Sequence, residues 1–136
     1  MRDSSYVAVN DPVSEARRYV ENAKEILREK ADLDPETQFY RDKKYVRMAG
    51  NTLWNGVLLI LEAVFHVGDH HRNRVDFYDY KMVIANRDLK LLDLVQKGYD
   101  SMHLAMGYDG NQSKALGQDS IVLANDIIDR CATMLP

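Results

Sequence analysis

Apolar residues recur at helical spacing along most of the chain, and in the longest such segment they surround the helix almost completely. This segment covers residues 45–65, and its second half, from Val57 onward, carries a single charge, Glu62. A helix that is wet on one side shows a polar stripe, whereas a helix that lacks this stripe is buried on several sides. We therefore expect residues 45–65 to form the central helix of an all-α protein.

A first helix is expected over residues 12–31. Asp11-Pro12 is a helix-start pattern, because aspartate caps free backbone N–H groups and proline is tolerated in the first turn. The same pattern at Asp34-Pro35 predicts that the second, central helix opens there and runs to about residue 66. The apolar stripe of the first helix has spacings of three and four and consists of Val13, Ala16, Val20, Ala23 and Leu27, with Lys30 at its end.

Three more helices are expected, over residues 76–85, 88–107 and from Ser113 to the end, with Asp88 and Ser113 as N-caps. Asp109-Gly110-Asn111 predicts a turn before the last of them. No segment predicts a strand. The fold class expected is an antiparallel up-down four-helix bundle with one extra short helix, in which residues 1–11 are a flexible lead-in and residues 12–136 a single domain. The long fourth helix carries a seam of Leu92, Val95, Tyr99, Met102 and Met106.

Composition narrows the chemistry. The chain has 136 residues and a formal net charge of −3, so a general affinity for nucleic acid is not indicated, although this net charge is compatible with a local basic patch. Cys131 is the only cysteine, which excludes an intramolecular disulfide and a multi-cysteine zinc site. Its place on an apolar stripe predicts a buried side chain. The first residues lack the apolar core of a signal peptide, and Arg47 with two glycines interrupts residues 45–65, so we expect a cytoplasmic protein with no membrane contact and no cofactor.

A basic, aromatic patch at the start of the second helix is the first candidate binding site. Tyr40, Lys44 and Arg47 share a face there, and such a patch grips phosphates and stacks on bases. Arg72 and Arg74, in a polar connection, would add to it if they lie nearby. The alternative is a solvated helix end whose positive side chains pair with Glu36 and Asp42.

A second candidate combines His103 with the turn that contains Tyr108, Asp109 and Asn111. These residues would form a polar rim for a ligand, or else a structural turn beside a partly buried, hydrogen-bonded histidine that pairs with Tyr99. Asn51 and Asn55 flank Trp54 one turn apart, and we assign them a structural or interface role rather than ligand binding.

His66, Asp69 and His70 have spacing suited to a metal ion on a helix. Gly68 interrupts that helix, so we expect a solvated turn there and no metal site. We also predict no catalytic residue.

Two apolar stripes on one helix require two partners, and the second stripe of the central helix predicts a homodimer. This stripe is additional to the one formed by Leu53, Val57 and Ile60. Its residues, which we expect at the dimer interface, are Trp54, Leu58, Leu61 and Phe65.

The segment from Tyr40 through Ala63 resembles the second helix of HEPN (higher eukaryotes and prokaryotes nucleotide-binding) bundles. Together with residues 99–111, it is similar to a small bacterial family of unknown function with a HEPN-like fold. The resemblance implies a helical bundle that dimerises. It also implies that non-catalytic members act as binding modules or as partners of a second protein, such as a nucleotidyltransferase.

Many HEPN proteins are metal-independent RNases in which four to six residues separate an arginine from a histidine on one helix. No arginine precedes a histidine at that spacing here. The nearest match is Lys97, which five residues separate from His103, but lysine lacks the planar, bidentate guanidinium of arginine. We therefore expect a non-catalytic interaction or binding module, and the alternative is a divergent metal-independent RNase or nucleotide-binding HEPN protein that uses Lys97, His103 and the turn with Arg72 and Arg74.

Overall fold

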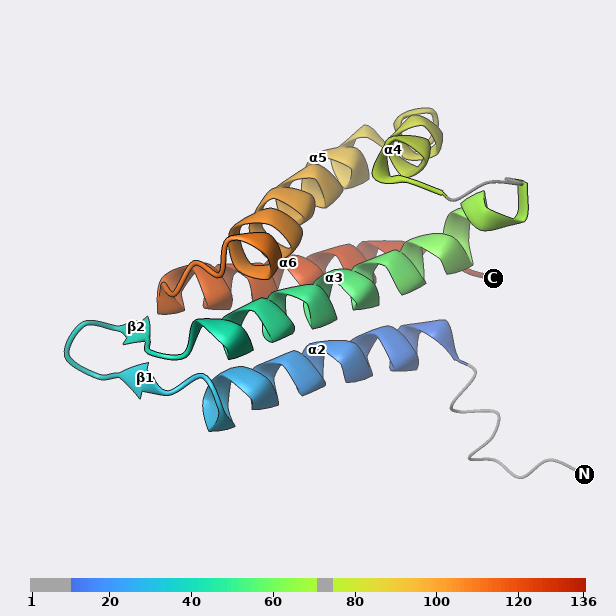
Figure 1. The fold of residues 1–136 in the computed structure, drawn as a ribbon. Helices are drawn as coiled ribbons and strands as arrows, with labels where there is room; N and C mark the ends of the chain where they lie inside the picture. Colours follow the sequence, from blue (N-terminus) through green and yellow to red (C-terminus); the bar gives the residue numbers. More distant parts are fainter. Residues whose placement is uncertain (1–10, 71–74) are drawn as a thin grey trace, which may run out of the picture.

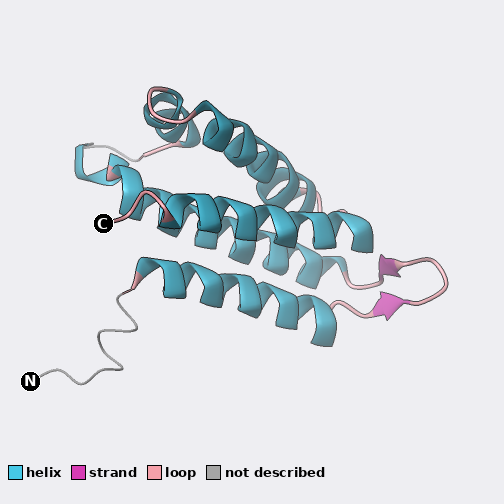
Figure 2. Ribbon diagram, turned by 180° about the vertical axis from the view of Figure 1, so that it is seen from behind, coloured by secondary structure: helices cyan, strands magenta, loops and turns pink. Residues whose placement is uncertain are grey.

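Three long helices lie side by side, and a second arm of the chain crosses them (Figure 1). The structure, a computed structural model, describes residues 11–70 and 75–136, without the side chains of residues 69 and 70. The long helices are α2 (Pro12–Glu29), α3 (Lys43–Phe65) and α6 (Lys114–Ala132). The arm consists of α4 (Phe77–Ala85), α5 (Leu89–Gly98) and η2 (Tyr99–Tyr108), a π-helix that continues α5 directly. Figure 2 shows the same arrangement from behind, and the expected all-α class is confirmed.

The central position predicted for α3 is confirmed. Helices α2, α6 and η2 all pack against it, and its side chains at Leu53, Val57, Ile60 and Leu61 are fully buried. By length and composition α3 would suffice to cross a membrane, but 56% of its most apolar window is buried inside the protein. That burial fits the core helix of a soluble protein.

The predicted helix starts are largely correct because their capping side chains bind free backbone N–H groups. Asp11 Oδ1 accepts from Val13 N at 3.1 Å, and Asp88 Oδ1 accepts from Leu91 N at 3.0 Å. Ser113 caps α6 in the same way. A short 3-10 helix, η1 (Val67–His70), directly follows α3.

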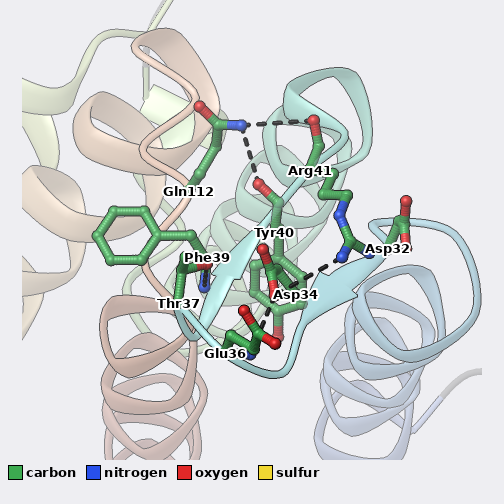
Figure 3. Close-up of polar contacts among 8 residues, drawn as sticks. All are labelled: Asp32, Asp34, Glu36, Thr37, Phe39, Tyr40, Arg41 and Gln112. Carbon is green, nitrogen blue, oxygen red and sulfur yellow. Dashed lines mark hydrogen bonds and ion pairs between the residues drawn. The ribbon is translucent and has the colours of Figure 1, made fainter.

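The predicted start of the second helix at Asp34-Pro35 is wrong, and so is the absence of strands. Residues 33–40 form a small hairpin of β1 (Leu33–Asp34) and β2 (Phe39–Tyr40), and α3 begins only after Asp42 (Figure 3). Asp34 Oδ1 does accept from Glu36 N, at 2.9 Å, but it closes a turn rather than a helix.

Tertiary contacts decide between the two conformations. The Tyr40 side chain is buried, its N–H donates to Gln112 O at 2.8 Å, and its carbonyl accepts from Gln112 Nε2 at 2.8 Å. A helix through these residues would turn the N–H and C=O groups of Tyr40 away from Gln112, so Phe39 and Tyr40 remain extended.

The fourth predicted helix differs in its second half. Residues 99–108 form a π-helix, in which each N–H bonds five residues back, instead of continuing the α-helix. Of the predicted seam, Val95, Met102 and Met106 are buried, while Leu91 is fully buried in place of Leu92.

The backbones of α3 and η2 touch where Gly50 faces Met106. A Cβ added at Gly50 would lie 2.5 Å from Met106 Cβ and 2.6 Å from Met102 O. Gly50 permits this close approach because it has no Cβ atom. The contact fixes the position of η2 along α3 and its orientation relative to α3.

Gly50→Ala is therefore expected to lower the free energy of unfolding by about 1–3 kcal/mol, because the backbone of η2 cannot move aside without repacking the core. Urea unfolding measures the change. Gly117→Ala is the matched control, since its new Cβ would meet Leu27 Cδ1 at an ordinary 3.5 Å. Removing a glycine from the interior of α6 should stabilise that variant by up to about 1 kcal/mol. Equal effects of the two substitutions would show that the α3–η2 contact is not tight.

Candidate functional site

An open cleft of about 630 Å³ lies between α3, the start of α4 and η2. Its volume is within the range of small-molecule sites, and its walls combine aromatic rings with a few polar side chains, as such sites do. π-Helical turns occur frequently at functional sites. The cleft is therefore the strongest candidate site in the described part of the chain.

Four rings form the inner wall of the cleft. Trp54 is only 5% exposed and meets Phe77 and Tyr99 edge-on, with ring centroids 5.4 and 5.6 Å away. Phe77 and Tyr99 stack in parallel at 4.1 Å, and the His103 ring lies 5.1 Å from Tyr99. The predicted pairing of Tyr99 with His103 is confirmed, and the wall joins α3, α4 and η2 into one rigid surface.

His103 has an unusual environment within this wall. It is half-buried, as predicted, but its Nδ1 atom is buried and has no hydrogen-bond partner among the described residues. Leaving a buried polar atom unpaired costs about 1–3 kcal/mol. Local violations of this kind are concentrated at functional sites.

The polar groups of the cleft lie at its rim. Asn51 and Asn55 are exposed on α3, one turn apart, and Asn51 Nδ2 donates to Gly107 O of η2 at 3.4 Å. Opposite them, Asp76 caps α4, where its Oδ1 accepts from Asp79 N at 3.1 Å. Asp76 is the only charged residue that lines the cleft in the described part of the chain, so the cleft carries a carboxylate and no cation there.

A partly buried hydrogen bond ties α4 to α3 at the cleft. Tyr80 OH donates to Glu62 Oε1 at 2.9 Å, and Gly68 N donates to both oxygens of the same carboxylate. Burial, and then the neighbouring Glu62 carboxylate, raise the pKa of Tyr80 well above its usual value. Glu62, the single charged residue in the apolar second half of α3, thus holds α4 in place as one wall of the cleft.

The basic residues and the polar turn that the sequence singled out lie together at the other end of the bundle. A Cβ added at Gly110 would meet Lys43 Cγ at 2.6 Å and Arg47 Cγ at 3.1 Å, so the turn packs against the aliphatic parts of these two side chains. Tyr108 is 76% exposed there, and Asp109 and Asn111 are exposed as well. None of these three lines the cleft that contains His103, so the structure divides the second candidate between two places.

Tyr40 does not join this basic surface, because its ring is buried in the hairpin region. Lys44 lies over the ring of Tyr45 at 5.2 Å. Arg72 and Arg74 are outside the described residues.

The ion pairs expected for the basic patch are not formed with Glu36 or Asp42. Arg41 instead pairs with Asp32 at 3.0 Å, as Figure 3 shows, and Asp42 caps α3. Within the described ranges, Lys43 and Arg47 have no ion pair.

The apolar stripe that predicted a dimer packs inside the chain itself. Trp54, Leu61 and Phe65 are buried, and Leu58 is half-buried beside the cleft. The second partner that α3 requires is therefore supplied by α4 and η2. A homodimer through these four residues stays a prediction, and they leave little surface for it.

The predicted solvated turn after α3 begins at His66, which ends the helix in the left-handed conformation with φ 52°. The side chains of Asp69 and His70 are outside the described residues. No group of three histidine, cysteine or acidic side chains with metal-binding geometry occurs among the residues that are described.

Cys131 is fully buried, as predicted, and burial raises the pKa of its thiol to about 12. A thiol held protonated at neutral pH is a poor nucleophile, so Cys131 has a packing role.

The residues that line the cleft were largely missed by the sequence reasoning. Of the predicted binding residues that the structure describes, His103 alone lies in it, and the sequence predicted a structural or interface role for Asn51 and Asn55. Two amides one turn apart on an otherwise apolar helix were the available signal. Their exposure depends on α4 standing away from α3, which no local pattern reveals.

Comparison with known proteins places the chain in a family. A family model described as "Domain of unknown function (DUF5618)" matches residues 11–133. The chain belongs to this family. A solved structure of a protein of unknown function from Dyadobacter fermentans is similar, with 38% sequence identity over 93% of this chain and 98% of that one, and a TM-score of 0.86. No curated protein matches the chain.

Tyr80→Phe is expected to lower the free energy of unfolding by roughly 1–2 kcal/mol, because it removes a hydrogen bond to a charged, partly buried carboxylate. Chemical unfolding measures the loss. Tyr78→Phe is the matched control on the same helix, where the exposed hydroxyl has no bond, and it should change stability by less than about 0.5 kcal/mol. Equal stability of the two variants would mean that the Glu62 bond does not hold α4.

Proposed function

We propose that the chain is a non-catalytic binding module whose cleft takes a small planar molecule that is neutral or positively charged. The observation that carries this proposal is the cleft itself, which is open beside a wall of four rings and has the exposed amides of Asn51 and Asn55 at its rim. The HEPN-like character of the bundle, a cytoplasmic location and a nucleotidyltransferase partner are consistent with such a role and belong to the same proposal.

Charge selects the class of ligand. Among the described lining residues, the Asp76 carboxylate is the one charged group, and a carboxylate favours a cation over an anion. The rings add to this preference, because the faces of Trp and Tyr are negative. Asn51 and Asn55 offer both donors and acceptors to a planar polar edge.

The same chemistry argues against the RNase alternative. Phosphoryl chemistry needs a cation beside the general acid or base, and Lys97, the described cation of that alternative, pairs with Asp93 at 2.9 Å outside the cleft. RNA cleavage by the purified protein that disappears in His103→Ala would contradict the non-catalytic proposal.

Benzamide, benzamidine and benzoate test the ligand class, since they share one size and differ in charge. We expect millimolar binding of benzamidine and benzamide, and much weaker binding of benzoate. The indole N–H of Trp54, the only tryptophan, reports binding as a single peak in an NMR titration.

Asn55→Ala should weaken the two binding compounds by about threefold to tenfold, because it removes one hydrogen-bonding group from the rim. Asn22→Ala, an exposed helical asparagine on α2, is the matched control and should have no effect. Preferred binding of benzoate, or equal effects of the two substitutions, would rule out the cleft as described.

A second candidate function, binding of single-stranded nucleic acid, is favoured by the basic surface at the hairpin end. Lys43 and Arg47 lie there without ion pairs in the described chain, next to Tyr108, whose exposed ring offers a stacking platform. The cations of the other helices are mostly paired, as Arg17 is with Asp129.

For this second function, we expect the double variant Lys43→Gln/Arg47→Gln to have a shallower salt dependence of binding. The slope of the log binding constant against the log salt concentration should decrease in magnitude by about 1.4, since each phosphate contact on a single strand contributes about 0.7. Fluorescence anisotropy with a labelled oligonucleotide measures the slope. Lys90→Gln is the matched control, because Lys90 is an exposed cation of α5 that has no ion pair within the described residues. An unchanged slope in the double variant would exclude this surface.

A further inference from the structure

The outer side of α4 and the start of α5 carry an exposed apolar surface, which we call the α4–α5 patch. Its main residues are Tyr78, Met82 and Leu89, which are 62%, 50% and 72% exposed, and the half-buried Leu92 lies between them. A groove of about 530 Å³ runs along these side chains. In Figure 1, the two helices form the corner of the molecule farthest from α2.

The composition of α4 shows why this surface is unusual. Seven of the nine residues in Phe77–Ala85 are apolar or aromatic, yet only Tyr80 and Ile84 are buried. A helix that is apolar on all sides is normally covered on several of them. The inner side of α4 is covered by α3 and α5, so its outer side lacks a partner within the described chain.

The charges beside the groove favour one kind of partner. Lys81 of α4 and Asp93 of α5 both line it, so its lining has one charge of each sign and no net charge. Asp93 also pairs with Lys97 of its own helix, and because both side chains of that pair are exposed, Asp93 can accept a second cation. A strongly charged partner would gain nothing from this pattern. A twofold axis through the groove, however, would lay α4 of one molecule on α5 of the other and bring each Lys81 to the partner's Asp93.

We propose that the α4–α5 patch is the contact surface for a second copy of this chain. This dimer differs from the one that the Trp54 stripe predicted, and it is independent of the cleft, because the patch lies on the opposite side of α4 from Tyr80. Exposed patches of this kind cover a few hundred Å², less than the roughly 800 Å² per partner of a stable complex. The dimer is therefore weak and reversible.

Sedimentation equilibrium of the full chain between about 5 and 500 µM should show a monomer–dimer equilibrium with a micromolar dissociation constant. Leu89→Glu should raise this constant by about tenfold or more, because it places charge at the apolar centre. The monomer should remain folded, since Leu89 is the first residue of α5, where an acidic side chain is favourable. Val122→Glu, an exposed apolar residue of α6, is the matched control and should leave the constant unchanged.

A charge exchange tests the twofold arrangement. Lys81→Glu and Asp93→Lys should each weaken the dimer, and the double variant should restore most of the lost affinity, because the opposite charges then meet again across the axis. Circular dichroism and thermal unfolding verify that each variant keeps the fold.

Three outcomes would overturn the proposal. They are a monomer throughout the concentration range, an equal effect of Leu89→Glu and Val122→Glu, and a double charge variant that is weaker than both single ones. A monomeric chain that binds a different protein, and loses it in Leu89→Glu, would assign the patch to that protein instead.

Discussion

Apolar side chains surround α3 on nearly every side, and each side has to be covered by another element. Helix α2 covers one side and α6 another, while η2 and α4 cover the side that carries Trp54. Because η2 and α3 touch backbone to backbone at Gly50, the position of η2 is fixed closely, whereas α4 reaches α3 mainly through the Phe77 and Tyr80 side chains. The cleft results from this difference, since α4 stands off from a helix that the others enclose.

The helix content and most helix starts were predictable because they depend on local chemistry. Asp11, Asp88 and Ser113 bind the free N–H groups of their own first turns, and the apolar periodicity needs no distant partner. The hairpin was not predictable in this way. Its strands are held by Gln112, more than seventy residues away from Tyr40, so a local helix-start signal at Asp34 was overridden.

The site was less predictable than the fold, for a related reason. His103 was recognised because histidine is chemically distinctive, but the rim was not, since Asn51 and Asn55 become a rim only when α4 lies opposite them. The polar turn at residues 108–111 was recognised and then separated from His103 by the path of the chain. Residue type indicated which groups are able to bind, and the packing of α4 and η2 determined which of them face one cleft.

Both ends of the described domain lie at the same side of the bundle, away from the hairpin. Asp11 and the last turn after α6 both lie at this end, whereas residues 33–40 and 108–111 lie at the opposite end (Figure 1). A tether attached where the chain enters the domain at Asp11, or where it leaves after α6, would be joined to one pole only. Immobilised through such a linkage, the molecule would present Lys43, Arg47 and Tyr108 outward into solvent.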